Sequence, residues 1–153
     1  MQLPEHCTLC PRRCGANRAA GRTGYCGAGD TLLAARAALH HWEEPCLSGD
    51  PNAATGSGTV FFTGCTLQCC YCQNYKISQQ GLGKPLTAER LAEIFMELQQ
   101  KGAKNLNLVT ATQWLPWGKP ALEVAASGRS PPPPRGGPCR WPITPAGTKP
   151  WKP

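Results

Sequence analysis

Four cysteines lie within eight positions in the middle of the chain, in the stretch GCTLQCCYCQN that covers residues 64–74. Three of them, Cys65, Cys69 and Cys72, have the spacing CxxxCxxC, and Tyr71 immediately precedes the last one. Three thiolates on one tight loop can ligate three irons of a cubane iron–sulfur cluster and leave the fourth iron open. An open iron can bind a substrate or a cofactor, whereas a four-cysteine site is closed.

The same loop has a second interpretation, because clustered cysteines in reduced compartments often bind zinc. Zinc takes four ligands, and Cys70 could supply the fourth, although the adjacent Cys69 and Cys70 rarely both reach one tetrahedral ion. We expect Cys70 to be a small residue that packs beside the loop. The spacing alone leaves both metals open.

A second group of four cysteines has the spacing C-x2-C-x3-C-x11-C near the N-terminus: Cys7, Cys10, Cys14 and Cys26. These thiols are enough for a complete four-cysteine site, either a structural zinc or an auxiliary iron–sulfur cluster. The alternative is that they are unligated thiols. Spacing does not choose between the two metals.

Length and composition limit the class of protein. A chain of 153 residues is about one domain. No apolar leader follows the N-terminus and no stretch approaches the roughly 20 apolar residues of a membrane span, so we expect a cytoplasmic protein without a membrane partner. The net charge is +7, but residues 1–115 carry only +2 of it. Most of the basicity lies in residues 116–153, and we therefore predict no nucleic-acid partner.

The chemistry-bearing residues need elements to position them. The run TVFF at 59–62 predicts a buried strand, and NLNLVT at 105–110 predicts a second. Between them Thr87 is placed to cap a helix, which Gly102 would end. Its apolar residues fall on one face: Leu91, Ile94, Phe95 and Leu98. Strand, loop, helix and strand in this order form a βαβ unit with parallel strands.

Composition divides the chain into three parts. Residues 1–45 form a Cys-rich N-terminal extension in which TLLAARAALHHWEEP fits helix and strand equally, and residues 46–115 contain the βαβ unit. Residues 116–153 contain a run of four prolines and show no helical or strand period. We interpret them as a disordered Pro-rich tail or as a GC-rich gene translated in a shifted frame.

The flanks of the cysteine loop carry a family resemblance. The stretch GSGTVFFTGCTLQCCYCQNYKIS, with CxxxCxxC and an aromatic residue after the first strand, resembles the radical S-adenosylmethionine (radical SAM) superfamily, and within it the pyruvate formate-lyase activating enzyme-like branch. CTLCPRRCGANRAAGRTGYCGAG is also similar to that branch's leader. The resemblance covers roughly residues 7–115. It implies the N-terminal fragment of a partial (β/α) barrel, which we take as the fold class.

The resemblance also implies a chemistry. Cys65, Cys69 and Cys72 would ligate a 4Fe-4S cluster whose open iron chelates S-adenosylmethionine, and Tyr71 would lie near the adenine. Thr110 and Thr112 follow the second strand, where barrels place ligand contacts. Relatives often have Gly-Gly-Glu at this strand, and this chain has LVTATQ instead. No residue is predicted to act as a catalytic acid, base or nucleophile.

The implied activity is that of an oxidoreductase. Reductive cleavage of S-adenosylmethionine would give a 5'-deoxyadenosyl radical, with a reductant such as flavodoxin or ferredoxin and a glycyl radical enzyme as protein substrate. A full (β/α)₈ barrel takes about 250 residues. We therefore expect this chain to assemble a cluster yet turn over poorly or not at all. The alternatives are a noncatalytic zinc- or cluster-binding module and a nonfunctional truncated product.

Overall fold

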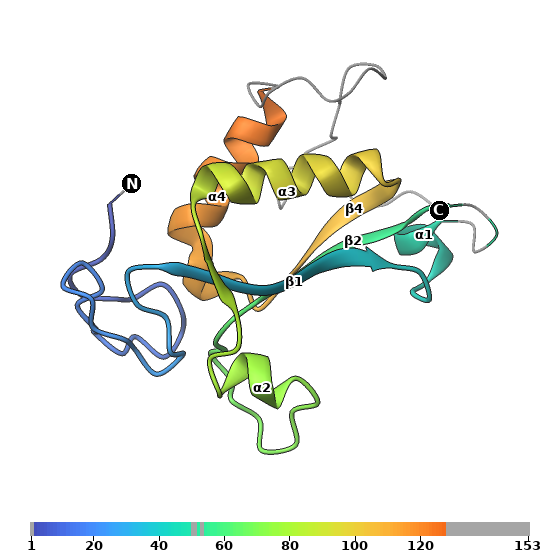
Figure 1. Ribbon diagram of the computed structural model, residues 1–153. Coiled ribbons are helices and arrows are strands. Elements are labelled where there is room, and N and C mark those ends of the chain that lie inside the picture. The colour runs from blue at the N-terminus through green and yellow to red at the C-terminus, as the bar shows by residue number, and fades with distance from the viewer. Residues whose placement is uncertain (1, 50–51, 53, 128–153) are drawn as a thin grey trace.

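The computed structural model describes residues 2–49, 52 and 54–127, which form a mixed α/β fold (Figure 1). The predicted α/β class is therefore confirmed. No helix of the described residues is long and apolar enough to cross a membrane. The elements in chain order are β1 Leu32–His40, α1 Pro45–Ser48, β2 Gly56–Phe62, α2 Tyr75–Ser78, β3 Lys84–Leu86, α3 Ala88–Gln100, β4 Ala103–Val109, the 3-10 helix η1 Thr112–Trp114, and α4 Leu115–Ala126.

The four strands form one sheet in the order β3-β1-β2-β4. β2 and β4 are parallel, with Thr59 opposite Asn107, which confirms the predicted parallel pair around a helical crossover. Within the described part of the chain β4 has no strand on its outer side, so it forms one edge of the sheet. Because β2 and β4 are parallel, their carboxyl ends meet at the same edge, and the cysteine loop starts there.

The segment that fitted helix and strand equally is a strand. β1 pairs antiparallel with both β2 and β3 and lies inside the sheet. The predicted boundary at residue 45 is therefore not a structural one, because residues 32–40 belong to the same sheet as β2. Only residues 2–31 lie before this sheet.

Helix α3 forms as predicted. The Thr87 side chain accepts a hydrogen bond from the Arg90 backbone N–H at 3.1 Å, which satisfies one of the free donors of the first turn. Leu91 and Phe95 are fully buried on the face toward the sheet. Gly102, with φ of +95°, follows the last turn in the left-handed region that favours glycine.

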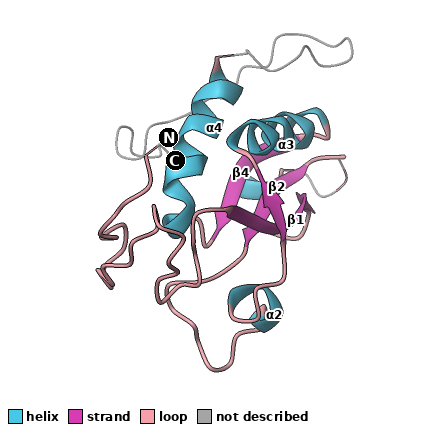
Figure 2. Ribbon diagram, turned by 60° about the vertical axis from the view of Figure 1, so that its left-hand side comes forward, coloured by secondary structure: helices cyan, strands magenta, loops and turns pink. Residues whose placement is uncertain are grey.

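Helix α4 corrects the prediction of a tail without structure from residue 116. It runs from Leu115 to Ala126 and packs beside α3 on the same face of the sheet (Figures 1 and 2). Trp117, Ala121 and Ala125 recur at every fourth position and are buried, which gives the helix one apolar face. Pro116 lies in the first turn, where a helix tolerates proline because that N–H has no intrahelical partner. The proline run 131–134 and Cys139 lie outside the described residues.

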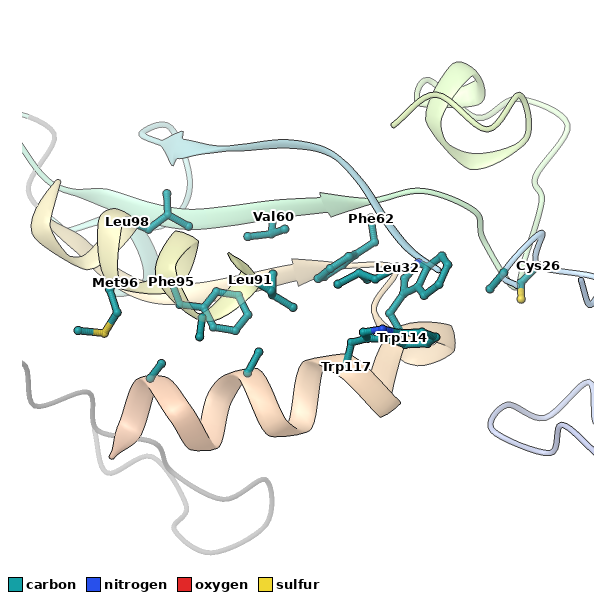
Figure 3. Close-up of a cluster of buried hydrophobic side chains, with 14 residues drawn as sticks. Cys26, Leu32, Val60, Phe62, Leu91, Phe95, Met96, Leu98, Trp114 and Trp117 are labelled. Carbon is teal, nitrogen blue, oxygen red and sulfur yellow. The ribbon is translucent and has the colours of Figure 1, made fainter. Parts of the chain in front are cut away.

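The buried side chains form one cluster between the sheet and the two helices (Figure 3). Phe62 and Leu32 from the sheet face Trp114 and Trp117, whose rings meet edge to face at a centroid distance of 5.4 Å. Cys26 lies at the end of this cluster, beside the chain that continues from Phe62. Cys26 and the start of the cysteine loop therefore share one end of the core.

A tryptophan substitution tests the correction at α4. We expect Trp117→Ala to lower the free energy of unfolding by about 3–5 kcal/mol, because it removes a large buried ring and leaves a cavity. Urea denaturation monitored by circular dichroism measures the change. The matched control is Trp42→Ala, whose ring is 93% exposed and whose loss should change stability by less than about 0.5 kcal/mol. Equal stability of the two variants would contradict a packed α4.

Candidate functional site

The cysteine loop, defined here as residues 64–74, connects the carboxyl end of β2 to α2 (Figure 1). It lies on the side of the sheet away from α3 and α4. Cys65, Cys69 and Cys72 are partly exposed, and Cys70 is exposed. The prediction that Cys70 packs beside the loop is therefore wrong, because its side chain faces solvent.

The loop starts at a glycine that no other residue could easily replace. Gly64 has φ of +81°, and a Cβ at this position would collide with the Cys26 carbonyl oxygen. That carbonyl accepts a hydrogen bond from the Cys65 backbone N–H at 3.1 Å. The Gly64 N–H donates to the Ile77 carbonyl of α2 at 3.0 Å. The backbone before the first cysteine is thus held from both sides.

Residues after β4 also form hydrogen bonds with the backbone at the start of the loop. The Gly64 carbonyl accepts hydrogen bonds from the Gln113 amide at 2.9 Å and from the Thr110 hydroxyl at 3.2 Å. The indole N–H of Trp114 donates to the Thr63 carbonyl at 2.8 Å. Because Gln113 and Trp114 are buried, these bonds form away from water.

The sulfur atoms of the loop accept hydrogen bonds. The Leu67 backbone N–H lies 3.4 Å from the Cys65 Sγ, and the Ser78 hydroxyl lies 3.4 Å from the Cys72 Sγ. A turn closes between the Cys69 carbonyl and the Cys72 N–H at 3.2 Å. Donors aimed at sulfur stabilise thiolates, which are the form that binds metals.

The donor set fits an iron–sulfur cluster in its chemistry. Three partly exposed thiols lie on one loop, and two of their sulfur atoms already accept hydrogen bonds. Among the residues that the structure describes, no three Cys, His, Asp or Glu side chains are arranged closely enough to hold a metal ion.

The N-terminal segment that carries the second cysteine group packs against the loop. The Arg12 guanidinium donates to the Thr66 carbonyl at 2.5 Å and to the Leu67 carbonyl at 3.4 Å, and it lies 3.6 Å from the centre of the Tyr25 ring. The Gln68 side-chain amide donates to the Tyr25 carbonyl. The two cysteine groups are thus parts of one region.

Within the second group the thiols have different environments. Cys14 is exposed, and backbone hydrogen bonds from Ala16 and Tyr25, with a smaller one from the Cys7 side chain, lower the pKa of its thiol. Cys26 is buried, and the loss of hydration raises the pKa of its thiol. Cys7 is also buried, whereas Cys10 is partly exposed. The spacing of the four cysteines gave no indication of these differences.

The three residues expected near the cofactor have different environments. Tyr71 is 87% exposed on the outer side of the cysteine loop. Thr112 is exposed at the start of η1. Thr110 has φ of +57°, and its hydroxyl donates to the carbonyls of Phe62 and Gly64. The Thr110 hydroxyl thus contacts the start of the loop.

Three residues that contribute to the site were missed from the sequence: Arg18, Gln113 and Trp114. Arg18 is one of several arginines in the N-terminal segment, and nothing in its neighbours marks it as buried. Gln113 and Trp114 follow the second strand directly, and the parallel pairing predicted there would have placed them near the cysteine loop. The position of these two residues directly after the strand was therefore the feature from which their role could have been predicted.

Comparison with known proteins agrees with this part of the structure. Residues 59–130, just under half of the chain, match the family model of the Radical SAM superfamily. The match covers most of β2, the cysteine loop, α3, β4 and α4, and it continues beyond residue 115, where we expected the resemblance to stop. The expected resemblance is thus confirmed for the superfamily, and the match names no branch within it.

A curated relative adds no activity. The chain is 31% identical over 112 residues to the protein named "Uncharacterized protein MJ0674" from Methanocaldococcus jannaschii. The aligned region covers 69% of this chain and 30% of the relative. The chain therefore matches less than a third of the length of that relative. No solved structure matches the chain significantly.

Alkylation can test the environments of the N-terminal thiols. After removal of metals with a chelator, we expect iodoacetamide to modify Cys14 faster than Cys26 at neutral pH, because the lowered pKa leaves more Cys14 as thiolate. As the pH is raised, the alkylation rate of Cys14 should increase at a pH below the ordinary thiol pKa of about 8.5. The alkylation rate of Cys26 should increase only at a pH above that value. Mass spectrometry of peptides measures both rates. Faster modification of Cys26 would contradict the packing described here.

Proposed function

We propose that this chain forms part of a radical SAM protein, in which Cys65, Cys69 and Cys72 ligate a 4Fe-4S cluster and the open iron binds S-adenosylmethionine. The observation that carries the proposal is the CxxxCxxC loop at the carboxyl end of β2, inside the stretch that matches the superfamily. When bound, the cluster supplies the single electron that cleaves S-adenosylmethionine to methionine and a 5'-deoxyadenosyl radical.

The chain's own residues prepare this site in two ways. Thr110, Gln113 and Trp114 hold the backbone at the start of the loop, so that its position does not depend on the metal alone. Leu67 and Ser78 place an N–H and an O–H on the sulfur atoms of two of the three ligands. Hydrogen bonds of this kind stabilise negative charge on sulfur and influence the potential of a cluster.

Two exposed side chains are available to a cofactor, one on the cysteine loop and one at the start of η1. Tyr71 precedes the third cysteine, and we propose that its ring contacts the adenine of S-adenosylmethionine. Thr112 is exposed at the edge where the parallel strands end, and we propose it as a second contact. Because the Thr110 hydroxyl already donates to Phe62 and Gly64, we assign Thr110 to the loop and not to the cofactor.

The surroundings of the loop support a protein as substrate or electron donor. Leu67, Tyr71, Tyr75 and Leu82 are large apolar side chains exposed on the loop and around α2. Next to them lies a pocket of about 520 Å³, lined by residues 73–77 together with Gln80 and Leu82. We propose that a reductant such as flavodoxin or ferredoxin and a glycyl radical enzyme dock here, which would make the whole protein an activating enzyme in the cytoplasm.

Spectroscopy of the reconstituted protein tests the cluster. After anaerobic treatment with iron and sulfide and reduction with dithionite, we expect an EPR signal that changes when S-adenosylmethionine is added. Cys65→Ser, Cys69→Ser and Cys72→Ser should each lower iron retention by more than the roughly 10–100-fold that follows loss of an outer-shell partner. Cys70→Ser is the matched control and should keep iron and signal, because Cys70 faces solvent. A colourless protein that carries only zinc would overturn the proposal.

We also propose that Cys7, Cys10, Cys14 and Cys26 hold a second metal, either zinc or a further cluster. The observation that favours it is the folding of this segment: Gly15 and Ala16 form hydrogen bonds with the backbone of Cys7, and the Cys14 sulfur lies against Gly24, two residues before Cys26. The anaerobically purified protein should then contain metal that Cys7→Ser or Cys26→Ser removes, as measured by elemental analysis. Cys46→Ser is the control, because Cys46 is an exposed thiol outside both groups. Equal metal content in all three variants would exclude this second site.

A further inference from the structure

Arg18 is a buried cation that has no carboxylate partner among the described residues. Its side chain is 1% exposed, and both ion pairs of the described residues belong to Arg90. A buried charge costs several kcal/mol of hydration, so residues such as arginine are rarely this deep without a specific set of partners. The position of those partners indicates what the arginine does.

The partners of Arg18 are backbone carbonyls and aromatic rings. Its Nε donates to the Gly29 carbonyl at 2.9 Å, and one terminal nitrogen donates to the Gln113 carbonyl at 2.6 Å. The guanidinium carbon lies 5.3 Å from the ring centres of both Trp114 and Trp117, where the negative faces of the rings attract a cation. The other terminal nitrogen is buried and has no hydrogen-bond partner in the part of the chain that the structure describes.

Gln113 transmits this contact to the cysteine loop. Its side chain is 2% exposed, and its amide nitrogen donates to the Gly64 carbonyl, next to Cys65. The backbone of Gln113 is thus held by Arg18 while its side chain holds the residue before the first ligand. An uninterrupted series of hydrogen bonds and one peptide bond joins Arg18 to Cys65.

A second series of contacts runs parallel to the first. The Cys26 carbonyl accepts from the Cys65 N–H, and Arg12 donates to the Thr66 and Leu67 carbonyls. The Leu67 N–H in turn donates a hydrogen bond to the Cys65 sulfur. The N-terminal segment therefore controls both the backbone and the sulfur environment of the first ligand.

We propose that Arg18 is a positioning residue for the first cluster ligand, which acts through Gln113 to fix Gly64 and the direction of Cys65. The predicted effect of Arg18 on a cluster rests on the proposed function. The predicted effect of Arg18 on the loop backbone is independent of that function. Arg18 touches neither the ligand nor any cofactor site. Its loss should loosen the loop without removing a thiol.

Amide hydrogen exchange in the metal-free full chain tests the structural part. We expect Arg18→Met and Gln113→Leu each to speed exchange at residues 63–68 by about three- to tenfold, which corresponds to the loss of one or two hydrogen bonds. Arg90→Met is the matched control, because it removes an exposed arginine on α3. Leu98→Ala is the stability control, because it removes a buried side chain of α3 and leaves a cavity in the core. Exchange at wild-type rates, or an equal rise in Leu98→Ala, would overturn the proposal.

The reconstituted protein tests the effect on the cluster. Because a looser loop backbone holds the Leu67 N–H less firmly on the Cys65 sulfur, we expect a lower midpoint potential and a changed EPR line shape in both variants, with the iron content retained. The double variant should show no larger shift than either single variant, because both changes interrupt one series of contacts. Additive shifts in midpoint potential would mean that Arg18 and Gln113 act independently and would contradict the proposal. If Arg18→Met does not fold, Arg18→Lys keeps the charge and loses the second hydrogen bond, and Gln113→Leu remains.

The two proposals fail in different ways. A wild-type protein that binds no cluster would remove the proposed function, yet the exchange experiment would still decide whether Arg18 positions the loop. A cluster whose potential is the same in wild type, Arg18→Met and Gln113→Leu would keep the function and reject the positioning role.

Discussion

The fixed backbone at Thr63 and Gly64 is the constraint on which the rest of the candidate site depends. These two residues follow the end of β2, and three separate parts of the chain bind them or the residue that follows: Cys26, Ile77 of α2, and the segment after β4 with Thr110, Gln113 and Trp114. Gly64 has to be glycine because of its positive φ and because the Cys26 carbonyl occupies the place of a Cβ. The first cysteine therefore leaves the sheet in one direction only.

The interior around this point is polar by necessity. A strand that ends under a loop leaves carbonyls without sheet partners, and such groups must be satisfied when they are buried. Side chains from η1 do this for the sheet, and Arg18 does it for η1 and for Gly29. The partners of this buried cation are backbone carbonyls and two indole rings. In other protein cores a buried arginine is usually paired with a carboxylate. The N-terminal segment is thus bound to the sheet by hydrogen bonds as well as by apolar contacts.

Sequence patterns predicted the parts of this protein that depend on local physics. The cap at Thr87, the apolar face of α3 and the parallel β2–β4 pair follow from residue types within a few positions of one another. The CxxxCxxC loop was equally visible. Helix α4 was not predicted, because residues 116–153 as a whole show no helical period, whereas in the structure Pro116 lies in the first turn and the spacing of buried residues continues past Pro120. The role of Arg18 could not be predicted, because it arises from a contact between residues 95 positions apart.

The long sequence separations have a consequence for how the protein is made in the cell. Gln113 and Gly64 are 49 positions apart, and chains are synthesised at about 5–20 residues per second, so the loop is present for roughly 2–10 seconds before the side chain that holds it exists. During that interval the four thiols of residues 65–72 are attached to a strand whose parallel neighbour has not yet been made. They are then open to oxidants and to any soft metal ion. The hydrogen bonds that fix the start of the loop therefore form late, after η1 has been synthesised.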